Sequence, residues 1–170
     1  MSDFPKDIYT EPQDIDVNTL NNLGPLAAMA GIWQGTRGLD IKPKAEGAKK
    51  QVYVERIELQ PIDPQTNGPQ LLYGLRYHTH ITKPDQVKTY HDQVGYWLWE
   101  PATGTIIHTI AIPRGQIVMA VGHAAADATE FELVATTTDV RFGIRSAPFL
   151  QPPFKTAALP IHVTITRDAT

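Results

Sequence analysis

The chain has 170 residues, of which 42% are hydrophobic and 19% are charged, and this composition suits one compact domain with a sizeable core. Its net charge of -3 gives no sign of the concentrated basic face of nucleic-acid-binding proteins, so no nucleic-acid partner is expected. The absence of cysteine excludes disulfides, thiolate metal ligands and thiol nucleophiles, and it is consistent with a reducing cytoplasm.

The N-terminal region lacks the features of a targeting or membrane segment. It has no positive stretch followed by an apolar one, as a signal peptide would, and no apolar run approaches the roughly 20 residues that cross a bilayer. We therefore expect a cytoplasmic protein without a membrane partner. Residues 1–15 are polar and hold two prolines, which predicts an extended arm. Residues 16–170 are expected to form a single barrel domain.

A short helical cap is predicted directly after the arm. Apolar residues recur at every third position from Val17 to Leu26, which is typical of one face of short helical turns. Pro25 suits the first position of a second turn, and Gly31 can end that turn. The segment therefore predicts a cap rather than a helical bundle.

From Gly31 onward the pattern changes to short runs rich in β-branched and aromatic residues, separated by turn residues. One strand is expected to begin at Ile32, and the other predicted strands are 52–60, 71–81, 93–100, 105–113, 116–124, 131–138, 140–146 and 161–166. Parallel strands need crossover helices, and the links here are too short to hold them. The fold class is therefore all-β and antiparallel, a sandwich or an up-and-down β-barrel, and a total of about 9–10 strands favours the barrel.

Residues 147–160 contain four prolines and cannot form a central strand. This segment links the last two predicted strands and carries Phe149, Leu150 and Phe154. Two interpretations stay open: a loop that packs its aromatic residues over one end of the barrel, or a flap over a ligand portal.

The stretch GIWQGTRG surrounds Trp33 with Gly31, Gly35 and Gly38. A phosphate-binding glycine loop lies between a strand and a helix, whereas here a helical turn comes first and a strand follows. The alternative is structural: Gly31 permits a sharp turn, and Trp33 closes one end of a barrel. Barrels of the lipocalin type begin in this way, and that resemblance implies that Arg167 stacks on Trp33 as a cation–π pair.

The order of motifs from about residue 20 onward resembles the nitrobindin family, which are haem barrels similar to fatty-acid-binding proteins. The matching residues are Gly31, Trp33 and Gly35 in G-x-W-x-G; Tyr53, Glu55 and Glu58 in the second strand; His91, Gly95 and Tyr96 in H-x3-G-[YF]; the strand and turn HTIAIPRG; and the closing IHVTITRD.

This resemblance implies a barrel that binds haem b through one histidine of the last strand, and peroxynitrite isomerase activity if haem is bound. His162 is the candidate axial ligand, and His108 is a second candidate within an apolar run. In a gapless alignment from the C-terminus, the axial position of the family falls on Pro160. Since positions two apart on a strand share a face, His162 could point inward one step further along, or the register could shift by two.

Two alternatives to haem remain. The first is a haem-free carrier of a small hydrophobic molecule, whose carboxylate could be held by Arg76, Tyr77, Arg141 and Arg145. The second is a metal site at His78 and His80, which share one face of a strand. A homodimer is compatible with the sequence, and no catalytic residue is identified.

Overall fold

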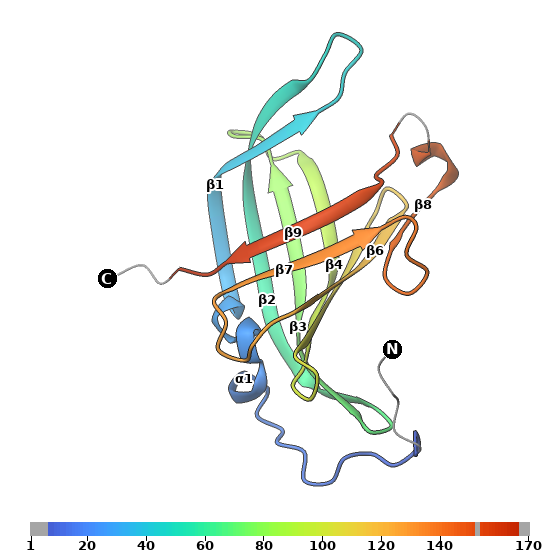
Figure 1. Cartoon of the computed structure of the whole chain (residues 1–170). Coiled ribbons are helices and arrows are strands. Elements are labelled where there is room, and N and C mark those ends of the chain that lie inside the picture. Colours follow the sequence, from blue (N-terminus) through green and yellow to red (C-terminus); the bar gives the residue numbers. More distant parts are fainter. Residues whose placement is uncertain (1–6, 152–153, 167–170) are drawn as a thin grey trace.

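The computed structural model describes residues 7–151 and 154–166 (Figure 1). Its elements, in chain order, are α1 (Thr19–Asn22), η1 (Gly24–Met29), β1 (Gly31–Lys42), β2 (Lys49–Asn67), β3 (Gln70–Thr82), β4 (Thr89–Glu100), β5 (Thr105–Ile112), β6 (Gln116–His123), β7 (Glu130–Thr136), β8 (Ile144–Ser146), η2 (Pro148–Leu150) and β9 (Ala158–Thr164).

The strands form one nine-stranded sheet with the order β1-β2-β3-β4-β5-β6-β7-β9, and β8 pairs with β6 beside β7. All ladders between these strands are antiparallel, as expected for neighbours joined by short turns. The sheet curls so that β7 and β9 cross in front of β2 and β3 (Figure 1). Within the described ranges β1 and β9 share no ladder, so the sheet is a half-barrel. The all-β, antiparallel class with a short helical cap is confirmed.

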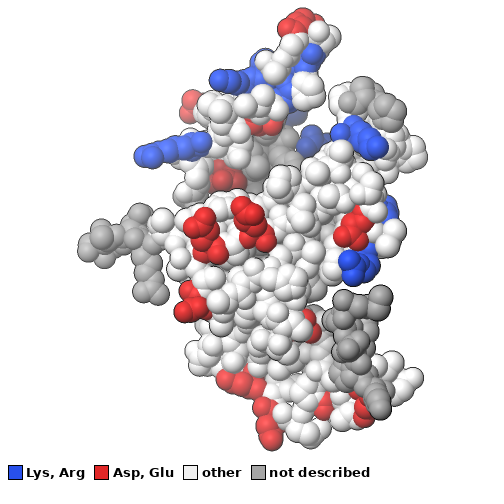
Figure 2. Space-filling view, in the orientation of Figure 1, with Lys and Arg blue, Asp and Glu red and all other residues white. Residues whose placement is uncertain are grey.

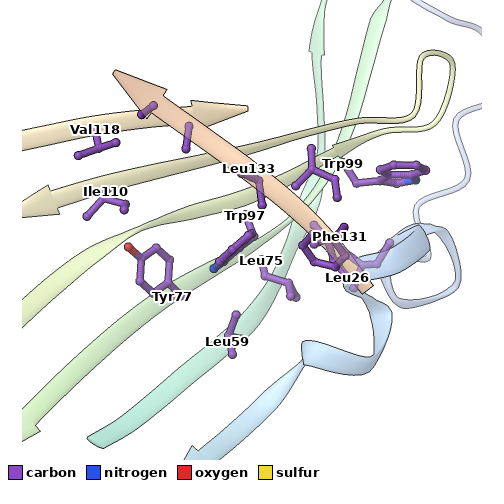
Figure 3. Close-up of a cluster of buried hydrophobic side chains, with 14 of the residues drawn as sticks. Leu26, Leu59, Leu75, Tyr77, Trp97, Trp99, Ile110, Val118, Phe131 and Leu133 are labelled. Atoms are coloured by element: carbon purple, nitrogen blue, oxygen red, sulfur yellow. The ribbon is translucent and has the colours of Figure 1, made fainter. Parts of the chain in front are cut away.

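The core lies on the inner face of the curled sheet. Alternate residues of the strands are buried there, including Tyr77 of β3, Trp97 of β4 and Leu133 of β7 (Figure 3). The cap closes one end of this core, since Leu23 and Leu26 are 0% exposed and belong to the same cluster. The helical turns therefore cover apolar side chains that would otherwise be exposed to water at the open end of the sheet.

The predicted end of the strand 52–60 was wrong, because β2 continues to Asn67 through Pro61 and Pro64. The β1 ladder begins with the pair Gly31 and Leu59, so beyond Leu59 no strand of the described ranges lies along that edge of β2. A proline is tolerated on such an edge because no ladder hydrogen bond is lost there. The chain turns at Gly68, which has a positive φ of 56°.

The last part of the chain also differs from prediction. The predicted strand 140–146 is reduced to β8, because Asp139 and the residues after it form a turn. β9 begins at Ala158 and includes Pro160, which its position at the edge of the sheet allows. Phe149 and Phe154 are 82% and 53% exposed, and their rings stack with centroids 6.3 Å apart. These rings are therefore not packed over a barrel end.

The segment before the cap is attached to the sheet by hydrogen bonds from β2 and β3. The Thr66 hydroxyl donates to Glu11 at 3.1 Å, and the Tyr73 hydroxyl donates to the carbonyl of Asp16 at 3.0 Å. As predicted, Pro25 occupies the first turn of η1. Among the residues that the structure describes, no helix has the length and apolar character needed to span a membrane.

Candidate ligand-binding site

A groove of about 1000 Å³ lies on the face of the sheet opposite to the core. Its floor is formed by side chains that alternate along β2 to β6 with the buried ones. They stand in two rows in register across the strands: Gln60, Arg76, Tyr96, Thr109 and Met119 in one row, and Glu58, His78, Val94, Ala111 and Ile117 in the other.

The floor is apolar where it crosses β4 to β6. Val94 and Tyr96 of β4 are 47% and 42% exposed, and Ile117 and Met119 of β6 are 58% and 37% exposed. Ala111 and Thr109 of β5 lie between these two pairs, so that Val94, Ala111 and Ile117 form a continuous apolar row. Contiguous exposed apolar side chains of this kind mark sites of ligand or partner binding. A concave surface with an apolar floor is the usual form of a small-molecule site.

One wall of the groove is the loop between β7 and β8. The Asp139 carboxylate accepts hydrogen bonds from the backbone N–H groups of Arg141 and Phe142 at 2.8 and 3.2 Å. These bonds, that of Arg141 first, hold the pKa of Asp139 below its usual range. The carbonyl of Gly143 accepts the N–H of Met119 at 2.9 Å, which ties the loop to β6.

Three arginines border the groove: Arg76 on β3, Arg141 in the loop and Arg145 on β8. Arg76 Nη2 donates to Gln60 Oε1 at 2.5 Å, and Arg145 Nη1 donates to the carbonyl of Ile144 at 3.0 Å. A guanidinium carries five N–H donors, so each arginine retains donors for an anion. All the arginines predicted for a carboxylate-binding carrier are thus brought to one groove.

Tyr77 was predicted together with these arginines, but its ring points to the core and is 3% exposed. There it ends a chain of hydrogen bonds that sequence reasoning did not find. Arg114 donates to His91 Nδ1 at 3.1 Å, so His91 Nε2–H donates to Gln93 Oε1 at 2.9 Å. The Gln93 amide then donates to the Tyr77 hydroxyl at 3.1 Å. His91 therefore ties the β5–β6 turn to the core.

His108 is buried on the inner face, where its ring stacks on Trp97 with centroids 3.7 Å apart and an angle of 14°. Its Nδ1–H donates to the carbonyl of Tyr96 at 3.2 Å. Burial lowers the pKa of His108 to about 4, so the imidazole is neutral at neutral pH. It borders neither the groove nor the second cavity described below.

His162 lies on the outer face of β9 and its side chain is 51% exposed. Its Nδ1 is 3.1 Å from Glu132, and its Nε2 is 3.0 Å from Thr164 and 3.2 Å from Glu130. Figure 2 shows carboxylates gathered over the region of β7 and β9. The inward positions of β9 belong to Leu159, Ile161 and Val163, which pack against the core cluster.

The two histidines predicted as a metal pair are separately bonded on the outer face. His78 Nε2–H donates to Asp92 at 2.9 Å, whereas His80 Nε2 lies 3.0 Å from the Thr89 hydroxyl. Their ring centroids are 6.3 Å apart. Within residues 7–151 and 154–166, no three histidine, cysteine or acidic side chains converge as metal ligands.

A second cavity, of about 360 Å³, lies between the β1–β2 pair and β9. Trp33 and Gly35 of the opening motif line it, and Trp33 Nε1–H donates to the carbonyl of Met29 at 2.7 Å. Gly31 adopts a φ of 127° at the start of β1, a backbone conformation that favours glycine. The predicted partner of Trp33, Arg167, lies outside the described residues.

A family model described as the THAP4-like, heme-binding beta-barrel domain matches residues 22–157. The chain belongs to this family, which is the nitrobindin family. A solved structure with a similar fold is that of Rv2717c from M. tuberculosis, with 22% identity, a TM-score of 0.53 and coverage of 88% of this chain and 82% of that chain. Comparison with curated protein sequences found no significant match.

Family membership makes this a small-ligand-binding barrel of a haem-binding family, and it raises the question of which residue could hold haem iron here. The family match ends at residue 157, directly before β9. On β9 the only histidine, His162, faces outward beside two carboxylates. His108 is chemically suited to bind iron, but its ring is covered by Trp97 and no described cavity reaches it. Neither of the two histidines predicted as axial ligands is therefore placed to hold haem iron in this structure.

Proposed function

We propose that this member of the family is a haem-free carrier of a small amphipathic carboxylate, which lies in the groove on the outer face of β2 to β6. The observation that carries the proposal is the combination of an apolar floor with a border of three arginines. The hydrocarbon part of the ligand would cover Tyr96, Ile117 and Met119. The carboxylate would bind Arg141 and Arg145, which lie at the same end of the groove as this floor.

The energetics favour this class of ligand over a purely apolar one. Burial of apolar surface contributes about 25 cal/mol per Å², which drives the chain of the ligand onto the floor. Arginine binds carboxylates through two parallel hydrogen bonds, which are stronger than bonds between neutral groups. An alcohol of the same length would keep the first contribution and lose most of the second.

Competition binding tests the proposal. Displacement of a fluorescent anilinonaphthalene sulfonate probe is measured with octanoate, octanol and octylammonium. We expect octanoate to compete at least about tenfold better than octanol, and the double variant Arg141→Gln/Arg145→Gln to lose this preference. Arg37→Gln, on β1 and outside the groove, is the charge-matched control and should change nothing. Equal competition by octanoate and octanol would contradict the proposal.

Titration with hemin tests the haem alternative in the same samples. Peroxynitrite isomerisation and axial ligation by His162 both depend on bound haem, and both stay predictions. Because His162 faces outward, we expect the hemin spectra of the wild type and of His162→Ala to be the same. A sharp Soret band that disappears in His162→Ala would establish axial ligation and would argue against a haem-free carrier.

The cytoplasmic location, the division into arm and barrel, the absence of nucleic-acid and membrane partners, and a homodimer also stay predictions. Light scattering at several concentrations would test the homodimer. The exposed apolar floor of the groove supports either a small ligand or a second copy. Loss of dimers on adding octanoate would indicate that ligand and partner compete for this surface.

A further inference from the structure

The cavity between β1, β2 and β9 differs in chemistry from the groove. Its wall is mostly apolar, with Met29, Ile57, Leu59 and Val163 on it, and it includes the indole of Trp33. Among the described residues that line it, one side chain is ionisable, the carboxylate of Glu55. A single charge in an apolar cavity is costly unless it has a partner.

Glu55 lies on the inward face of β2, two residues before Ile57 and four before Leu59. No hydrogen bond or ion pair joins its carboxylate to another described residue, whereas Glu58 on the opposite face pairs with Arg56. Burial raises the pKa of Glu55, as expected for a carboxylate that lacks a partner.

The opening motif explains how the cavity accommodates this side chain. Gly35 is the cross-strand partner of Glu55, and a Cβ at Gly35 would lie 3.3 Å from Glu55 Cγ and Oε1. Because Gly35 has no side chain, the Glu55 carboxylate has room to lie over β1. Trp33, two residues before Gly35 on the same face, is the diagonal cross-strand neighbour of Glu55, a separation that long and aromatic side chains can bridge.

We infer that this cavity binds a small organic ammonium ion, held between the Glu55 carboxylate and the indole of Trp33. The carboxylate supplies the counter-charge, and tryptophan is the aromatic residue that best attracts a cation to its face. The apolar wall at Met29, Leu59 and Val163 suits the hydrocarbon part of such a ligand. This site is separate from the groove, so either proposal can fail without the other.

The guanidinium of Arg167, like the inferred ligand, is a cation with N–H donors, and this residue lies outside the described ranges. The two sources of a cation are separated by comparing the wild type with Arg167→Gln. A cation site for a free ligand requires binding in the wild type.

Calorimetric titration with benzylammonium at about pH 8, against benzyl alcohol as the neutral analogue, tests the inference. We expect one benzylammonium per chain and at least tenfold weaker binding of benzyl alcohol. Glu55→Gln should weaken benzylammonium at least tenfold, and Trp33→Leu should weaken it several-fold. Glu46→Gln, in the exposed turn between β1 and β2, removes the same charge and should leave the affinity unchanged.

Proton release gives a second readout that a merely structural role of Glu55 would not produce. A bound cation favours the ionised carboxylate of Glu55. In a titration at a pH near the raised pKa of Glu55, binding should therefore release protons, and the measured heat of binding should depend on the buffer that takes them up. Tyr53 is the titratable neighbour on β2, and the cavity wall from β1 and β9 carries no charged described residue.

Proton release that is present in the wild type and absent in Glu55→Gln supports the inference, provided that both proteins show the same unfolding midpoint. Equal affinities for benzylammonium and benzyl alcohol, or no binding at all, would overturn it. Binding that is seen only in Arg167→Gln would also overturn it, because the chain's own guanidinium would then be the cation.

Discussion

Protonation of His108 should set a measurable part of the pH dependence of stability. The side chain is 3% exposed, and burial lowers its pKa from 6.5 to about 4. Between these two values the unfolded chain binds one proton more than the folded chain. The free energy of unfolding therefore falls as the pH drops through this window, and the contribution of neutral His108 is fully present above about pH 6.5.

The size of the effect follows from the two pKa values. The full shift corresponds to about 3 kcal/mol at 1.36 kcal/mol per pKa unit. At about pH 5 the unfolded histidine is almost fully protonated and the folded one is mostly neutral. The loss of stability between about pH 7.5 and pH 5 from His108 alone is then about 2 kcal/mol.

The perturbation that isolates this contribution is His108→Phe, which keeps an aromatic ring against Trp97 and cannot be protonated. Urea unfolding at about pH 7.5 and pH 5, followed by tryptophan fluorescence, gives the free energy of unfolding for both proteins. The variant loses the hydrogen bond to the Tyr96 carbonyl at both pH values, so this cost cancels when the unfolding free energies of the variant at the two pH values are subtracted. If the free energy of unfolding of His108→Phe falls between about pH 7.5 and pH 5 by the same amount as that of the wild type, within about 0.5 kcal/mol, the reasoning is refuted.

Three further predictions concern the packing of the sheet and the wall of the groove. Gly95→Ala places a Cβ 1.9 Å from the Thr109 carbonyl oxygen, and we expect the unfolding free energy to fall by more than about 3 kcal/mol; a fall below about 1 kcal/mol would show that β4 can move aside. Leu75→Ala, at a position with 0% exposure, should cost about 2–5 kcal/mol in urea unfolding, whereas Leu39→Ala, 50% exposed, should cost less than about 1 kcal/mol; similar losses at both sites would argue against the assigned faces. Asp139→Ala removes the acceptor for two backbone N–H groups of the groove wall and should weaken octanoate several-fold in the competition assay, and unchanged affinity would exclude a role for this wall.

Much of the fold could be predicted from the sequence because its signals are local. The change from three-residue spacing before Gly31 to β-rich runs after it located the cap and the first strand correctly. Short turns between the runs required antiparallel pairing. The errors in β2 and at the start of β9 come from treating proline as a strand breaker. Pro61 and Pro64 in β2 and Pro160 in β9 all lie where, among the described residues, one side of the strand has no partner strand. Whether a proline is tolerated depends on the neighbouring strand, which local sequence does not reveal.

The candidate site was harder to predict, because in a β-sheet function depends on which face a residue occupies. The sequence identified Arg76, Arg141 and Arg145 as a group, but not that a groove outside the core would unite them. Tyr77 is adjacent to Arg76 in sequence and was included with it, yet the alternation of the strand sends its ring to the other face. The rows of the groove floor become visible only when the register of five strands is known.

The same alternation explains why His162 of this chain is not placed to bind the haem that the family is named for. His162 lies between Ile161 and Val163 on β9. Since successive side chains of a strand point to opposite faces, its imidazole lies beside Glu130 and Glu132 rather than in the core. A shift of one residue in the β7–β9 register would exchange the two faces, exposing Ile161 and Val163 to water and burying His162. The apolar side chains resist this shift, although they are only partly buried and each therefore contributes less than the roughly 1.5–3 kcal/mol of full burial. The placement of His162 is thus maintained by its neighbours, and a haem ligand on β9 would require the strand to give up its own core contacts.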